Sequence, residues 1–309
     1  MRTTSIRAKW VALACTALIA VLSSCSQSGS VPSEDSGAEE QHQAELVLET
    51  AADVAAMVPR DMAAKGTLRV GVALYSPPSV YYQAGSKQLV GVDVEVARAL
   101  AQVMGLPEVE FVPVPFNRIL ERLGDDYDIA ASIISVTSER LTKSNFVTYA
   151  ETGSVFVTKI GNPHKFDPQD VCGEQELAES NTVQLDQVEL VSAQCVASKS
   201  EPLEVITEKT IDDEVMALRL DRAPAAYLDS VVADHLTSGS GSRLVQSGTV
   251  QNRGPVGVAV DDTNAQLTVA VQAAMQLIMD EGILEQILKN YGVAEAALSS
   301  SSINPRTEW

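Results

Sequence analysis

The sequence is poor in the residues that build metal centres and nucleophilic active sites. It contains three histidines and four cysteines in 309 residues, and these form no Cys-x-x-Cys pair and no Cys/His cluster. A Gly-x-Ser-x-Gly nucleophile elbow and a glycine-rich phosphate loop are also absent. We therefore expect no metal site, no cofactor and no enzymatic activity.

Positive charge is scarce as well. The chain carries 22 Lys and Arg against 41 Asp and Glu, which gives a formal net charge of −19. Such a negative surplus argues against a nucleic-acid partner and against flat electrostatic binding to an anionic membrane. It is compatible with attraction of cationic solutes, although acidity is more often a feature of soluble surfaces.

A short apolar run near the N-terminus predicts export. Three basic residues precede the run, which spans 10–22, and Leu-Ser-Ser-Cys closes it. These are the parts of a secretory signal over residues 1–24, and about 13 residues are too few to span a bilayer. Leu-Ser-Ser-Cys resembles the bacterial lipoprotein box, which implies that Cys25 carries lipid and becomes the first mature residue. An ordinary secretory signal with an incidental cysteine is the alternative.

Two segments flank the folded part. Residues 25–43 are rich in Ser, Glu and Gln with few apolar residues, so we expect a disordered tether. Residues 298–309 are expected to form a loose tail for the same reason. Helical spacing of apolar residues begins directly after the tether, over 44–57. About 250 residues remain for one large or two modest domains.

Removal of the signal and lipidation of Cys25 would leave two cysteines, Cys172 and Cys195. An even number of cysteines in an exported protein suggests a disulfide. Two reduced thiols in the core are the alternative.

Strand and helix patterns alternate in the central region. A β-branched run over 67–74 precedes an amphipathic helix over 90–105. Strands are then expected at 108–114 and 127–134, with a helix over 117–124 between them. Such alternation is typical of βαβ units on a parallel sheet, so we predict the α/β class.

Two candidate crossover segments, 151–161 and 253–262, divide the chain into two α/β lobes. The predicted organisation is lobe 1 over 44–152, lobe 2 over 153–253, and a return to lobe 1 over 254–297.

Two stretches resemble the extracellular solute-binding proteins of family 3, the receptors of polar amino-acid ABC importers. GVDVEVARALAQVMG (91–105) is similar to the signature helix of that family. Residues 127–163 resemble the family segment that ends a strand, presents an arginine and leads into the hinge. The resemblance covers about 65–292. It implies a monomer with a two-lobed periplasmic-binding-protein-like fold of type II, in which two parallel-sheet lobes are joined by a two-segment hinge.

The resemblance also implies a ligand site divided between the lobes. It assigns Arg140 to the α-carboxylate of the ligand, to which a guanidinium offers a planar fork of donors. It assigns Asp229 to the α-ammonium, because a buried cation requires an opposite charge. A bare N-cap of the following helix is the alternative role of Asp229.

Four further positions match ligand-contacting positions of the family: Ser135, Ser132, Phe116 and Thr182. Tyr75 is a fifth candidate, although it lies about one residue from the position where the family often has an aromatic residue. The hydroxyl of Ser135 would reach the carboxylate, and Phe116 would cover the ligand. Core packing is the alternative for Phe116, and a bare N-cap is the alternative for Thr182.

Three positions depart from the family pattern. Ala73 stands where an acid is frequent, Ile133 where the pocket loop has a small residue, and Val183 where a second threonine is usual. The clamp for the amino-acid backbone is thus retained, whereas the side-chain pocket is altered. The missing acid at Ala73 weighs against lysine or arginine as the ligand.

The implied function is the substrate-binding receptor of an ABC importer, anchored by lipid on the extracytoplasmic side of the membrane. It would capture a small polar solute, most simply an amino acid, and dock on a membrane permease with its ATPase. The alternatives are a ligand-sensing receptor for a membrane signalling protein and a dehydratase-like enzyme on the same fold.

Overall fold

The computed structural model describes residues 48–239 and 241–307. The predicted signal segment, Cys25 and the predicted tether lie outside the described residues.

One eight-stranded sheet, in the order β4-β1-β5-β10-β6-β9-β7-β8, runs through the described part. Its strands are β1 (Thr67–Val72), β4 (Glu108–Pro113), β5 (Ile129–Ser135), β6 (Ser144–Lys159), β7 (Gln175–Glu179), β8 (Glu204–Glu208), β9 (Ala225–Asp229) and β10 (Leu244–Asp261). A separate antiparallel pair consists of β2 (Tyr81–Tyr82) and β3 (Leu89–Val90).

The α-helices of the described residues are α1 (Ala52–Ala55), α2 (Arg60–Lys65), α3 (Val92–Val103), α4 (Val183–Ala197), α5 (Ile211–Arg219), α6 (Ser230–Ser238), α7 (Ala265–Asp280) and α8 (Ile283–Asn290). Short 3-10 helices are η1 (Phe116–Arg118), η2 (Arg140–Thr142) and η3 (Ala294–Ala296). No single helix among these residues is long and apolar enough to cross a bilayer; α7 and α8 reach that length and composition only as a pair bent by 77°.

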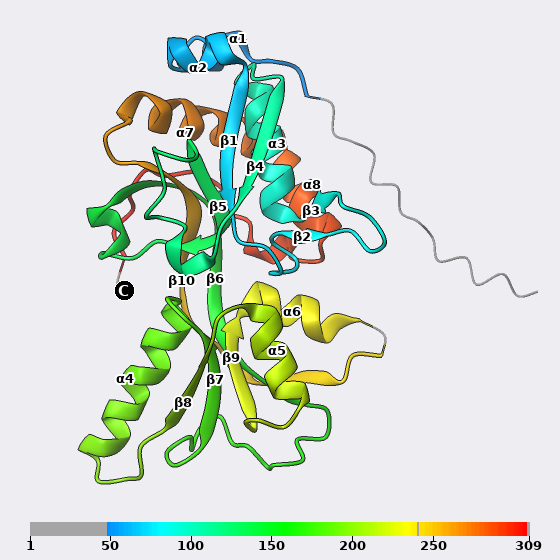
Figure 1. Ribbon diagram of the computed structural model, residues 1–309, viewed down its shortest axis with the longest axis vertical. Helices are drawn as coiled ribbons and strands as arrows, with labels where there is room; N and C mark the ends of the chain where they lie inside the picture. Colours follow the sequence, from blue (N-terminus) through cyan, green and yellow to red (C-terminus); the bar gives the residue numbers. More distant parts are fainter. Residues whose placement is uncertain (1–47, 240, 308–309) are drawn as a thin grey trace, which may run out of the picture. The chain divides into compact units, whose positions relative to one another are not determined.

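The long strands β6 and β10 connect the two lobes (Figure 1). They pair with each other in antiparallel fashion from Ser144 to Lys159. In lobe 1, β5 pairs with the final part of β10 and continues into the parallel strands β1 and β4. In lobe 2, β9 pairs with the second half of β6 and continues into the parallel strands β7 and β8. The α/β class is therefore confirmed, and the two parallel sheets are joined into one by the crossing strands.

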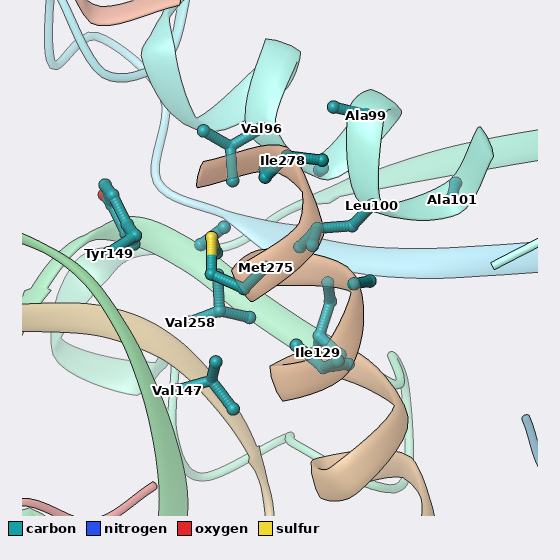
Figure 2. Close-up of a cluster of buried hydrophobic side chains, with 14 of the residues drawn as sticks. Val96, Ala99, Leu100, Ala101, Ile129, Val147, Tyr149, Val258, Met275 and Ile278 are labelled. Carbon is teal, nitrogen blue, oxygen red and sulfur yellow. The ribbon is translucent and has the colours of Figure 1, made fainter. Parts of the chain in front are cut away.

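Helices α3, α7 and α8 form the core of lobe 1 with one face of its sheet. Figure 2 shows Leu100 of α3 and Met275 of α7 beside Ile129 and Val258 of the sheet. These side chains have no more than 1 % exposure, and burying one such aliphatic side chain stabilises the fold by about 1.5–3 kcal/mol.

Lobe 2 has helices on both faces of its sheet. The side chain of Leu177 in β7 packs with Val215 and Leu218 of α5 on one face. Ala178, the next residue of the same strand, packs with Val188 of α4 on the other face. This alternation follows from the two-residue period of a strand, and it decides which way the glutamates of β7 point.

Two expected helices are shorter than predicted. The helix expected over 117–124 is only η1, followed by turns, and the Tyr127 hydroxyl donates a hydrogen bond to the Ile119 carbonyl in this region. Of the helix expected over 44–57, the described residues contain the four residues of α1, and α2 begins only after Pro59. Apolar spacing alone did not reveal these turns.

A disulfide joins Cys172 and Cys195, as predicted. Cys172 lies in the loop before β7, and Cys195 lies in α4 with 2 % exposure. The bond fastens the long helix of lobe 2 to the segment that enters its sheet. By the loop-entropy argument, a closed loop of this size contributes about 3 kcal/mol.

The C-terminal segment, which we expected to be loose, is hydrogen-bonded to β6. Asn304 donates its N–H to the Phe146 carbonyl at 3.0 Å, and its side-chain oxygen accepts from the Phe146 N–H at 2.8 Å. Ser302 likewise exchanges hydrogen bonds with Thr148, and Leu298 bonds to Tyr149. The first half of β6 has β10 on one side only, because β9 pairs further along the strand. The segment therefore covers an open strand edge, a tertiary requirement that its polar composition conceals.

Truncation tests this contact. Removal of residues 298–309 should lower the free energy of unfolding by about 2–4 kcal/mol, because several hydrogen bonds worth about 1 kcal/mol each are lost. Removal of residues 305–309 alone keeps the bonds described above and is the matched control. Chemical denaturation measures both variants; equal stability of the two would contradict the role of the segment.

Candidate functional site

A cleft is lined by side chains of both lobes. Six of the seven ligand residues expected from the sequence lie along it: Phe116, Ser132, Ser135, Arg140, Thr182 and Asp229. The three departures from the family pattern, Ala73, Ile133 and Val183, line the same cleft. The structure thus brings most of these positions together although they are up to about 150 residues apart in the sequence.

Arg140 begins η2 and carries the cation of the cleft. Its Nη1 donates to the Ser135 carbonyl and its Nη2 to the Asn181 carbonyl, both at 2.9 Å. The guanidinium also lies over the Phe116 ring, 5.7 Å from its centre. Burial lowers the pKa of Arg140, but a guanidinium stays charged in proteins. Two of its five N–H groups donate to backbone carbonyls, so the other three can donate to a carboxylate.

Asp229 ends β9 on the opposite lobe. Its Oδ1 accepts the Val231 N–H at 2.8 Å, so it is the N-cap of α6. Burial raises its pKa to about 6. The N-cap role uses one oxygen and leaves acceptor capacity for a second donor, so the capping and ligand roles are compatible.

Hydroxyl side chains hold the loops of the cleft. The Ser132 Oγ accepts the Ala73 N–H at 2.8 Å and thereby ties the end of β1 to β5. The Thr182 hydroxyl accepts the Leu185 N–H at 3.2 Å and donates to the Glu179 carbonyl at 2.7 Å. Thr182 is thus the N-cap of α4, whose first residues, Val183 and Gln184, also line the cleft.

Tyr75 does not line the cleft. Its side chain is 48 % exposed and contacts the edge of the Tyr82 ring. The backbone at Tyr75 has a φ of +65°, and this turn places Ser76 rather than Tyr75 along the cleft.

Asp93 is a positioning residue that the sequence analysis treated only as a mark of the family. Its carboxylate is fully buried. It accepts hydrogen bonds from the Ser79 hydroxyl at 2.6 Å, the Tyr149 hydroxyl at 2.7 Å and the Ile133 N–H at 3.1 Å. Ile133 has a φ of +45° and lies in the cleft. Asp93 therefore fixes an unusual backbone turn at the site, while burial raises its own pKa to about 6.

Three buried glutamates of lobe 2 were also missed. Glu176 and Glu214 have no exposed surface, and Glu179 is 9 % exposed. Burial raises the pKa of Glu176 and of Glu179 to about 8 and raises that of Glu214 well above its ordinary value. Only Glu179 and Glu214 line the cleft. A glutamate within an otherwise apolar helix face or strand was the sequence signal that could have revealed them.

Among residues 48–239 and 241–307, no group of three or more His, Cys, Asp or Glu side chains is arranged to hold a metal ion. The charged and polar side chains that line the cleft offer charge pairing and hydrogen bonding.

A two-lobed fold with a charged cleft between the lobes defines a class of binding proteins, and sequence comparison gives the family. Residues 68–294 match the bacterial extracellular solute-binding proteins, family 3. The chain belongs to this family. Its fold is that of the type II periplasmic binding proteins, as the sequence resemblance implied.

Relatives with a stated ligand support this placement. The chain is 31% identical over 264 residues to the arginine-binding protein ArgT of Corynebacterium glutamicum, covering 84% of this chain and 85% of the relative. It is 25% identical over 232 residues to the L-cystine-binding protein TcyJ of Escherichia coli, covering 74% and 83%. A solved structure named a putative L-cystine ABC transporter from Listeria monocytogenes matches with a TM-score of 0.67 at 20% identity, covering 76% and 99%.

Substitution of Asp93 tests its positioning role. Asp93→Ala should lower the free energy of unfolding by about 3 kcal/mol or more, because two hydroxyls and one N–H lose a buried acceptor. Asp93→Asn keeps the shape and one acceptor oxygen, so it should cost less. Chemical denaturation measures both; an Ala variant as stable as the original protein would contradict the assigned role.

Proposed function

We propose that this chain is the substrate-binding receptor of an ABC importer and captures an amino acid between its lobes. One observation carries the proposal: a guanidinium and a carboxylate, those of Arg140 and Asp229, line one cleft from opposite lobes. An amino acid carries the two complementary charges on its α-carbon. Arg140 would bind the α-carboxylate, and Asp229 the α-ammonium.

Capture follows from the division of the site. A zwitterion that contacts both lobes makes interactions in the closed state that an open state lacks. It therefore shifts the equilibrium towards closure by the difference between its affinities for the two states. Exclusion of water from the closed cleft strengthens each charge pair.

The named relatives support an amino acid as the ligand, since two of them are described as binding arginine and L-cystine. The proposed partner is a membrane permease with its ATPase, on which a monomeric receptor docks in the closed form. Capture of a solute requires no catalytic group, and we propose no reaction for this chain.

Export and anchoring complete the proposal. The N-terminal segment has the pattern of a secretory signal followed by a lipoprotein box, so Cys25 would carry lipid and hold the receptor at the outer face of the membrane. The tether would let the folded part reach the permease.

Ligand binding is tested by thermal unfolding against the standard amino acids and L-cystine. A ligand that binds only the folded state at a hundred times its dissociation constant adds about 2.7 kcal/mol of stability. We expect one amino acid or a small group of them to raise the midpoint. Arg140→Ala should abolish the shift, because the carboxylate loses its charge partner.

Arg118→Ala is the matched control, because this arginine is exposed and pairs with Glu121 outside the cleft lining. Asp229→Asn should also weaken binding, although it removes the charge and keeps an oxygen for the N-cap. Absence of a shift with every amino acid, or a shift that survives Arg140→Ala, would refute the proposed clamp.

Anchoring is tested by Cys25→Ala in a bacterial host. The variant should leave the membrane fraction, because the side chain that would carry lipid is gone, and should appear in the soluble exported fraction. Ligand binding by the released protein serves as the control for folding. Retention of the variant in membranes would contradict lipid attachment at Cys25.

A further inference from the structure

Two carboxyl groups in the cleft have no partner in the clamp described above. They belong to Glu179, the last residue of β7, and Glu214 in α5. Residue alternation in β7 turns Glu179 to the same face as Leu177, which packs against α5. Helical spacing places Glu214 on the buried face of α5 between Ile211 and Leu218. The two glutamates therefore meet from neighbouring elements at one part of the cleft lining.

Glu214 is the more deeply buried of the two carboxyl groups. Its side chain has no exposed surface, and neither carboxyl oxygen accepts a hydrogen bond from any described side chain. The donor that does act on it is the Glu179 backbone N–H, whose effect on the pKa of Glu214 is weaker than that of burial. Native proteins pair nearly all buried polar groups, because an unpaired one costs free energy. A buried carboxyl group without a side-chain donor at the lining of a ligand cleft points to a donor that arrives with the ligand.

No basic side chain of the described residues forms an ion pair with either glutamate. Arg140 is directed at backbone carbonyls and is attracted by Asp186 and Glu139 instead. The ion pairs nearby are Arg222 with Glu208 and Lys159 with Asp221.

The other charged groups around Glu214 are negative or already paired. Glu179 faces it from β7, and Glu208 faces it from β8. Asp213, its neighbour on α5, raises the pKa of Glu179 by repulsion between the two carboxylates. It also accepts a hydrogen bond from the Thr210 hydroxyl. Among the described residues, lobe 2 thus contributes carboxyl groups and no basic side chain to the lining of the cleft.

We infer that Glu179 and Glu214 form a subsite for a cationic ligand side chain, an ammonium or a guanidinium. The inference rests on the proposed function and specifies the ligand class for the same cleft. Two adjacent carboxyl groups offer four acceptor oxygens, which match the three or five donors of such a cation. Because both groups hold protons more strongly than usual, entry of a cation should release protons from them.

Proton release makes the affinity for a cationic ligand depend on pH. The complex with a cationic ligand binds fewer protons than the empty protein, so its affinity should rise as the pH increases from 6 to 8. The increase is at most about tenfold per pH unit for each proton released. A neutral ligand of the same shape keeps the protons on both glutamates, so its affinity should rise only about twofold over this range, from the ionisation of Asp229, whose pKa is about 6.

Calorimetric titration with two matched ligand pairs tests the inference. L-Arginine and L-lysine are compared with L-citrulline and L-norleucine, which share the α-groups but have neutral side chains. We expect at least one cation to bind at least tenfold more tightly than its neutral counterpart at pH 8. Repetition in buffers of different ionisation enthalpy should show proton release for that cation only.

Glu214→Gln and Glu179→Gln should each reduce this preference to about threefold or less while leaving the neutral ligand nearly unaffected. Glu176→Gln is the matched control, because Glu176 is equally buried and unpaired but lies outside the cleft lining. Glu214→Gln should also raise the unfolding midpoint more at pH 8 than at pH 5. The folded state keeps a proton on this carboxyl that the unfolded chain releases above about pH 4.3, so the original protein loses stability over that range.

The results of these titrations distinguish failure of the cationic subsite from failure of the proposed receptor function. If citrulline binds as tightly as arginine, norleucine binds as tightly as lysine, and binding requires Arg140, the amino-acid receptor stands and the cationic subsite is refuted. A preference for the cation that survives both glutamine substitutions also refutes the subsite. If no amino acid binds to the original protein, the receptor proposal fails and the subsite fails with it.

Discussion

The antiparallel pairing of β6 with β10 is the constraint on which the molecule depends. Both strands serve two lobes, so the lobes share one hydrogen-bonded ladder, and every residue of the cleft is positioned relative to it. The ladder is interrupted near the crossing point, where its register shifts between Ser247 and Gln251 and again before Gly254. Such irregularities locally break the pairing and increase twist. Close packing also restricts residue 153 of β6 to glycine, because a Cβ at Gly153 would lie 2.5 Å from a Val250 methyl.

The charges of the cleft are distributed unequally between the two lobes. Lobe 1 supplies the cation Arg140, whereas the carboxyl groups of Asp229, Glu179 and Glu214 come from lobe 2. The guanidinium already bridges the lobes by its hydrogen bond to the Asn181 carbonyl. No described basic side chain forms an ion pair with these acidic groups of lobe 2, and burial raises the pKa of each of them.

Sequence patterns predicted those parts of the molecule that local periodicity or a family motif controls. The α/β class and the two-lobed fold of the family belong to this group. Arg140 and Asp229 line one cleft, and their assignment to the ligand stays a prediction. The C-terminal segment could not be predicted, because its partner is the edge of a strand about 150 residues earlier. Tyr75 was misplaced, because one left-handed backbone turn moves a side chain away from the cleft. Glu214 was overlooked, because the sequence does not show that this side chain is buried without a side-chain hydrogen-bond donor.

The position of the acidic groups bears on how a ligand would close the lobes. An acid at Ala73 would have placed the side-chain contact on lobe 1, together with the α-carboxylate contact. In the proposed complex, lobe 1 holds only the carboxylate, and lobe 2 holds both positive groups of a cationic amino acid. Every favourable charge contact then spans the cleft through the ligand. A neutral amino acid loses one of the contacts with lobe 2, so it binds less tightly even when its α-groups bind equally well. Closure would then depend on the contact of the α-carboxylate with Arg140, and selectivity on the two glutamates.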